Sequence, residues 1–179
     1  MRHTNTLLVT ATLVALGTSN LGAQATDGAD SILLPSIHRG ASYIESVISV
    51  SAERMTADDY ALKPTPEVRS FAQLVGHIAD SNYDFCSVMK GEKNPVESIE
   101  KSSTAKADLQ RALAESFEYC RPALLAMNGA KGREIVKFQG ASLPAVVVMN
   151  YRSYHLLLHY GNVITYLRLR GKVPPSTSP

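Results

Sequence analysis

Apolar residues recur at helical spacing in four segments of this chain, at about 34–54, 70–90, 104–127 and 142–171. Within each segment they return every three or four residues, which gathers them on one face of an α-helix. The connections between the segments are polar or contain glycine and proline, as loops do. Strand patterns are nearly absent, which argues against an α/β enzyme. The pattern therefore predicts an all-α fold, a four-helix bundle.

Local signals mark the ends of the second and third segments. Ser70 followed by Gln73 is a capping box, which starts the second helix. Gly91 is a suitable stop for that helix. Pro122 lies inside the third segment, where it should kink the helix or end it early.

The fourth helix is expected to begin near Ser142, with Pro144 in its first turn, and to end at Gly171. A short extended piece at 135–138 would precede it. Arg152 is the only charged residue between positions 143 and 167. This helix should therefore be buried on most of its sides.

The polar side chains of the fourth helix share one face, because steps of three and four residues separate them. They are Arg152, His155, His159, Asn162 and Tyr166. A stripe that faced water would be expected to carry Lys and Glu, and this stripe carries neither. We interpret it as the wall of a polar cavity inside the bundle, with Arg152, Asn162 and Tyr166 as candidate pocket residues. Burial there would keep imidazole neutral and able to bind metal.

His155 and His159 are four residues apart, so their side chains stack on one helical face. A third imidazole from another helix, such as His77, would complete a three-ligand site with positions left open, the layout of catalytic metal sites. Leu156 follows His155, so the pair lacks the glutamate of the His-Glu-x-x-His protease motif. Histidines buried or exposed without metal remain the alternative. Asp80 could support His77 or be a solvated surface charge.

Bulk composition narrows the choice of class and partner. The chain has 179 residues, which suits one domain, and 45% of them are hydrophobic, enough for a proper core. The formal net charge is only +2, and no block of basic residues stands out. Nucleic acid is therefore a poor candidate for the partner.

The N-terminal segment has the pattern of a signal peptide. A short basic start precedes a mostly apolar run from Leu7 to Leu16, which is too short to span a bilayer. Small residues follow, and cleavage after Ala23 or Ala25 fits the A-x-A pattern. We predict a signal peptide at 1–25, an exported protein, periplasmic or secreted, and no membrane span in the mature chain. The bundle domain would occupy 30–175.

Cys86 and Cys120 are the only cysteines, and export raises the expectation of a disulfide. Each lies 16 residues past the start of its predicted helix, since 86 − 70 and 120 − 104 both give 16. Two parallel helices would bring the thiols to similar depth, and the connection between the helices is long enough to return along the bundle. This requires an up-down-down-up order. Two buried free thiols remain the alternative.

Two stretches of the chain resemble the signature sequences of the DinB/YfiT-like superfamily. They are VRSFAQLVGHIADSNYDFC, from Val68 to Cys86, and HLLLHYGNVITYLRLRGKVPP, from His155 to Pro175. The second is the more specific, with His-Tyr-Gly, Tyr-Leu-Arg and Gly-x-Val-Pro-Pro in order. The resemblance covers nearly the whole chain after the N-terminal segment, and it implies a four-helix bundle in which three histidines hold a divalent metal. Carried over position by position, the ligands are His77, His155 and His159.

One departure concerns the residues between the two histidines of the fourth helix. Many members of the superfamily have polar residues there, whereas this chain has Leu156, Leu157 and Leu158. These leucines point away from the histidine face, so metal ligation is preserved. They suggest a helix buried on its other sides, or a surface for a partner.

The resemblance implies a metal-dependent enzyme that acts on a small molecule, a thiol or an electrophile, because the superfamily includes thiol S-transferases and a thiol-dependent isomerase. Cytosolic thiol cofactors are scarce outside the cell, so a hydrolase with metal-activated water is the second enzymatic reading. Three imidazoles suit zinc, nickel or iron.

The alternative is a non-catalytic bundle that binds a metal or a partner, and a homodimer is compatible with either reading. A cavity beside His155 that opens to solvent would favour an enzyme. A sealed polar pocket would favour the structural role.

Overall fold

The computed structural model describes residues 21–177. Its four long helices are α1 (Leu21–Arg54), α2 (Phe71–Lys90), α4 (Lys106–Leu125) and α6 (Ala145–Leu169). They account for most of the described chain, so the all-α fold is confirmed. Residues 1–20, most of the predicted signal peptide, lie outside the described residues, and cleavage after Ala23 or Ala25 stays a prediction. No helix in the described part of the chain has the length and apolar character needed to cross a membrane.

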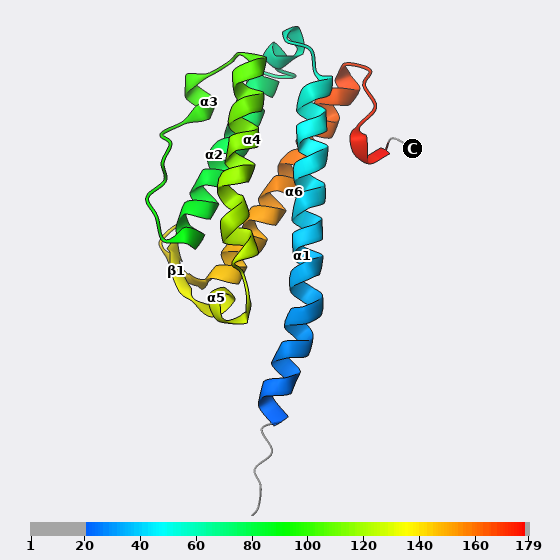
Figure 1. Ribbon diagram of the computed structural model, residues 1–179. Coiled ribbons are helices and arrows are strands. Elements are labelled where there is room, and N and C mark those ends of the chain that lie inside the picture. The colour runs from blue at the N-terminus through cyan, green and yellow to red at the C-terminus, as the bar shows by residue number, and fades with distance from the viewer. Residues whose placement is uncertain (1–20, 178–179) are drawn as a thin grey trace, which may run out of the picture.

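The helices run in the order up, down, down, up, with α2 and α4 parallel (Figure 1). Helix α2 packs against α4 and α6, and α1 packs against the same two helices. The connection from 91 to 105 carries the short helix α3 (Ile99–Ser102) and returns along the bundle, which allows α2 and α4 to run the same way. Two short 3-10 helices, η1 (Asp58–Ala61) and η2 (Pro175–Thr177), complete the upper end.

Helix α2 has the ends that the sequence predicts. The side chain of Ser70 accepts a hydrogen bond from the Gln73 backbone, and the Gln73 side chain accepts one from the Ser70 backbone. Gly91 ends the helix in the left-handed conformation, with φ of 71°. Pro122 does not end α4, which continues to Leu125.

The fourth helix begins later than the sequence predicts. Residues 142–144 belong to a β-hairpin, in which β1 (Ile135–Phe138) pairs antiparallel with β2 (Ala141–Pro144). Gln139 and Gly140, with φ of 48° and 83°, form its two-residue turn, because both central positions of such a turn take positive φ. The hairpin and the short helix α5 (Gly129–Arg133) lie at the lower end of the bundle (Figure 1).

Buried apolar side chains fill the space between the helices. Large ones that are almost fully inaccessible come from each part of the bundle: Ile48, Phe71, Ile78, Leu109, Leu113, Leu156 and Leu167. Each such side chain contributes roughly 1.5–3 kcal/mol relative to an exposed position. The core thus fixes how α2 and α6 face one another, which positions the residues of the candidate site.

A buried polar network ties the four long helices together. The fully buried Arg152 of α6 donates to Glu45 of α1, at 2.5 Å, and to Asn82 of α2, at 2.9 Å. Asn82 donates in turn to Ser116 of α4, at 3.0 Å. Arg152 was predicted to line a cavity. In the structure it is fully buried, and its hydrogen bonds connect α6 to α1 and α2.

Cys86 of α2 and Cys120 of α4 form a disulfide, with 5.2 Å between their Cα atoms. The two helices run parallel (Figure 1), as the predicted pairing of the cysteines requires. The bond crosslinks the two helices joined by the long connection.

Helix α6 is less buried than its apolar composition predicts. Tyr151, Tyr154, Leu157 and Leu158 are exposed, and Leu158 keeps 65% of its surface. Of the three consecutive leucines only Leu156 enters the core. The expectation of a helix buried on most sides is therefore wrong, because the bundle covers one face of α6 only.

Candidate metal centre

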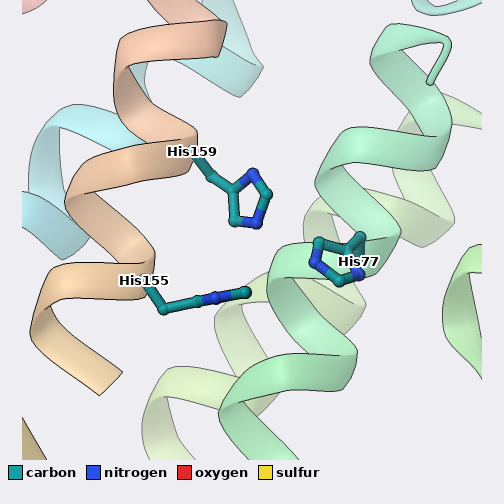
Figure 2. A group of neighbouring side chains, drawn as sticks. All are labelled: His77, His155 and His159. Atoms are coloured by element: carbon teal, nitrogen blue, oxygen red, sulfur yellow. The ribbon is translucent and has the colours of Figure 1, made fainter. Parts of the chain in front are cut away.

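His77, His155 and His159 gather between α2 and α6 (Figure 2). One ring nitrogen from each lies within 4.8 Å of the others. The ring centroids are 4.4 Å apart for His155 and His159, 4.7 Å for His77 and His159, and 5.2 Å for His77 and His155. The i, i+4 spacing on α6 and the facing position on α2 thus produce the cluster that the sequence predicts.

The environment of the cluster favours neutral imidazoles. Burial lowers the pKa of His159 to about 4, with smaller contributions from His155, His77 and Arg69. Burial also lowers the pKa of His155, and then His77 and Arg69 lower it further. Burial and the Arg69 charge lower the pKa of His77, against the opposing charge of Glu100. Neutral imidazole carries the lone pair that a metal requires.

The His155 ring is held by a serine on the opposite helix. Ser81 Oγ lies 3.0 Å from His155 Nε2 and donates its single proton to the His77 backbone carbonyl, at 2.7 Å. The hydroxyl therefore accepts from His155, whose Nε2 carries the proton. This leaves Nδ1 of His155 as its unprotonated nitrogen.

The other two rings have different partners. His77 Nδ1 lies 3.3 Å from both Glu100 Oε2 and Arg69 Nη2. His159 Nδ1 lies 3.5 Å from the Asn162 amide nitrogen, while its Nε2 is buried with no hydrogen-bond partner. A buried polar atom without a partner is costly, so His159 Nε2 is in need of one.

The three residues fit a divalent ion. Imidazole nitrogens on a tetrahedral zinc lie roughly 3.3 Å apart, as follows from Zn–N bonds of about 2.0–2.1 Å. Small side-chain rotations would close the present separation of up to 4.8 Å. The ring nitrogens that face one another in Figure 2 include one from His159 and one from His77. An ion between them would satisfy His159 Nε2.

The cluster borders two open hollows. A pocket of about 720 Å³ reaches His159 and is also lined by Asn162, Tyr166, Arg69 and Glu100. Many of its lining residues are exposed, so it opens to solvent. A second hollow of about 300 Å³ reaches His155, with walls that include Phe85, Phe138, Tyr154 and Leu158.

The remaining candidate residues have distinct places. Asn162 lines the larger pocket beside His159. Tyr166 lines it too, and its hydroxyl donates to the Arg69 backbone carbonyl. Asp80 faces α3, where it accepts hydrogen bonds from the backbone of Ile99 and Glu100.

Sequence reasoning missed Ser81 and Glu100, both of which contact a histidine of the cluster. Ser81 lies four residues after His77, the spacing that places it on the same face of α2, and this signal was available. Glu100 lies in the connection between α2 and α4, where no periodicity indicates which way a side chain points.

The model of the DinB superfamily matches residues 45–163, more than half of the sequence. The chain belongs to the DinB superfamily. Among solved structures, a DinB-like protein from Bacillus cereus matches with a TM-score of 0.70 at 13% identity, over 79% of this chain and 95% of that one. A DinB-like protein from Bacillus subtilis matches with a TM-score of 0.64 at 22% identity, over 77% and 93%.

A mycothiol-dependent maleylpyruvate isomerase also shares the DinB fold with this chain. Its TM-score is 0.57 at 16% identity, over 76% of this chain and 67% of the isomerase. At these identities the likeness establishes the fold alone. A search of curated proteins finds no match.

Proposed function

We propose that this DinB-superfamily protein is a metal-dependent enzyme whose divalent ion is held by His77, His155 and His159. The observation that carries the proposal is the buried, unpartnered Nε2 of His159, which lies in a cluster of imidazoles with lowered pKa. An ion bound there would have three protein ligands and open positions, as catalytic sites do. The set of nitrogen donors suits zinc, nickel or iron.

The pocket supports a catalytic role over a structural one. The larger pocket connects His159 to solvent, and its volume of about 720 Å³ suits a small-molecule substrate. The hollow beside His155 is open as well. A site meant only to hold metal for stability would be closed by a fourth protein ligand.

A thiol is the first candidate for the substrate or cosubstrate. One protein with this fold is a mycothiol-dependent isomerase, which supports thiol chemistry on the scaffold. A bound divalent ion would supply Lewis acidity that lowers the pKa of a coordinated thiol or water. The chain's own residues would position the substrate: Arg69 and Asn162 line the pocket with polar groups, and Tyr166 holds the Arg69 backbone.

Hydrolysis is the second candidate, and the signal-peptide pattern at 1–25 favours it. We propose that the protein is exported, to the periplasm or beyond, where cytosolic thiol cofactors are scarce. An exported enzyme with this site would use water as the nucleophile. Mass spectrometry of the exported protein would give the position of cleavage.

The metal content of the purified protein tests the proposal. Protein isolated from its native compartment is expected to contain one divalent ion per chain by elemental analysis. His77→Ala, His155→Ala and His159→Ala should each weaken binding sharply without unfolding the bundle, because apolar contacts form the core. His38→Ala, which removes a histidine outside the cluster, is the control and should keep the metal.

Two results would overturn the metal site: no metal in wild-type protein after reconstitution at neutral pH, or full metal content in each of the three variants. If the metal binds but metal-loaded protein turns over neither thiol-plus-electrophile pairs nor ester and amide substrates, the non-catalytic metal-binding bundle becomes the better description. The exposed apolar residues of α6 would then favour a protein partner or a homodimer.

A further inference from the structure

We infer that Glu100 is a positioning residue for His77, accepting a hydrogen bond from Nδ1–H so that Nε2 faces the ion. The inference rests on the proposed metal site and adds a residue from outside the helices that carry the ligands. Histidine ligands commonly donate their second ring N–H to a carboxylate, which fixes the tautomer and the ring orientation.

The contact itself is direct. Glu100 Oε2 lies 3.3 Å from His77 Nδ1, and both side chains are about one-fifth exposed. The other carboxylate oxygen, Oε1, accepts from Arg69 Nε at 2.9 Å. Glu100 therefore has one oxygen for each neighbour, and the contact with the arginine keeps the second oxygen turned toward the imidazole.

Two groups approach His77 Nδ1, the Glu100 carboxylate and the Arg69 guanidinium, and metal binding would determine which of them forms a hydrogen bond with it. Arg69 Nη2 lies at the same distance, 3.3 Å, but a guanidinium has only donors. When Nε2 binds an ion, Nδ1 carries the proton and must donate. Glu100 is then the one of the two that can accept.

Asp80 holds Glu100 in place through the backbone. Its carboxylate accepts from the backbone N–H of Ile99, at 2.6 Å, and of Glu100, at 3.0 Å, and from Ser98 Oγ at 3.2 Å. Asp80 lies three residues after His77 on α2. One face of α2 thus carries both the ligand and the group that anchors the ligand's partner.

Gly76 lets α3 approach α2 closely enough for the contact. A Cβ at position 76 would lie 2.7 Å from Glu100 Cα and 2.9 Å from Glu100 N, distances that real Cβ atoms do not adopt. Glycine inside a helix is destabilising relative to alanine. Gly76 directly precedes His77, and the backbone of Glu100 occupies the space that a side chain at position 76 would fill.

The contacts of Asp80 and Gly76 could serve only to hold the long connection against α2. In that case the Glu100 carboxylate would have no role at His77. The two roles therefore differ in what Glu100→Ala and Glu100→Gln do. In the positioning role, glutamine restores function by turning its one amide oxygen to Nδ1–H, and the contact with Arg69 Nε is then lost. Glu97, exposed in the same connection, offers a matched control.

The experiment compares wild type, Glu100→Ala, Glu100→Gln and Glu97→Ala in two measurements. Zinc affinity is measured by competition with a chromophoric chelator. The tautomer of His77 is measured in the metal-free protein by long-range proton–nitrogen correlation of labelled histidine. Thermal unfolding of each variant establishes that it folds.

We expect Glu100→Ala to weaken zinc binding by roughly 10–100-fold and to shift metal-free His77 away from the Nδ1–H tautomer. Glu100→Gln should recover most of both properties, and Glu97→Ala should match wild type. Unchanged affinity and tautomer in Glu100→Ala would overturn the inference. A Glu100→Gln variant as weak as Glu100→Ala, with the wild-type tautomer, would also overturn it, since the charge would then act on the ion itself.

Failure of the metal site gives a different result. If wild type binds no zinc, the proposed function is wrong, whereas the metal-free tautomer still reports whether Glu100 accepts from His77. If wild type binds zinc and Glu100→Ala matches it in both zinc affinity and His77 tautomer, the proposed metal site is supported and the positioning role of Glu100 is wrong.

Discussion

His155 Nε2 donates a hydrogen bond to Ser81 Oγ across the interface of α6 and α2, with 3.0 Å between the two atoms. Because the serine proton is already given to the His77 carbonyl, the serine leaves His155 one tautomer only. The backbone carbonyl of His77 thus fixes the tautomer of His155. Two histidines of the cluster are linked before any ion arrives.

Replacement of Ser81 by alanine should loosen this arrangement. Ser81→Ala is expected to lower zinc affinity about tenfold, since partners of ligating histidines typically contribute 10–100-fold. Ser87→Ala is the control, because Ser87 is also buried on α2 and donates to a backbone carbonyl, that of Asp84. Chelator competition measures both. Equal affinity in the two variants would show that Ser81 has no influence on the site.

Gly76→Ala should destabilise the protein although alanine favours helix. Its Cβ would meet the backbone of Glu100 at 2.7 Å, so α3 must move away from His77. Gly161→Ala on α6 meets no atom within 4 Å and should stabilise by roughly 0.5–1 kcal/mol. Chemical denaturation measures both, and zinc affinity should fall only in Gly76→Ala. A stabilised Gly76→Ala variant would contradict the close approach.

The metal-free protein should lose stability as the pH falls from about 6.5 to about 4. Burial lowers the pKa of His159 from 6.5 to about 4, so in this range the unfolded chain binds a proton that the folded chain does not. The free energy of unfolding then decreases with falling pH, by about 3 kcal/mol for this residue at 1.36 kcal/mol per pKa unit. His159→Gln should reduce the dependence, and the lowered pKa values of His155 and His77 account for what is left. Denaturation curves across the range provide the measurement, and a flat wild-type profile would refute the prediction.

The Cys86–Cys120 disulfide should leave no free thiol in protein denatured without reductant. Its closure of a 34-residue separation should contribute about 4 kcal/mol, mainly by restricting the unfolded chain. Cys86→Ala with Cys120→Ala should lower the free energy of unfolding by this amount and keep the bundle fold. Quantitative thiol labelling and denaturation decide the matter. Two labelled cysteines in fresh native protein would disprove the bond.

The helices and the His155–His159 pair could be predicted because they depend on spacing within single helices, whereas the resemblance to the DinB/YfiT-like superfamily supplied His77. His155 and His159 share a face whatever surrounds them, and the lack of Lys and Glu in their stripe indicates a polar interior. The start of α6 was predicted three residues too early, since Pro144 suits both a helix N-terminus and the end of a strand. The turn at Gln139 and Gly140 was the signal for the hairpin.

Glu100 could not be predicted in the same way. Its position depends on where a loop crosses a helix, which no local period encodes. Gly76 was a clue in the sequence, because a glycine inside a helix often marks a close neighbour, but Gly161 on α6 gives the same signal and has no neighbour within 4 Å. Arg152 was placed on the correct face of α6, but its partners Glu45 and Asn82 lie far away in the sequence and could not be named.

The up-down-down-up order places the three histidines and Glu100 on different parts of the chain: the histidines lie on α2 and α6, and Glu100 lies on the connection from 91 to 105. The three histidines of the cluster lie on helices that pack through the core, whereas the connection from 91 to 105 lies over α2, where Asp80 and the close approach at Gly76 hold it. That connection delivers Glu100 to the edge of the pocket. A bundle with this order can therefore exchange the residues at the edge of this pocket by altering one connection, while the helices that carry the three histidines stay the same.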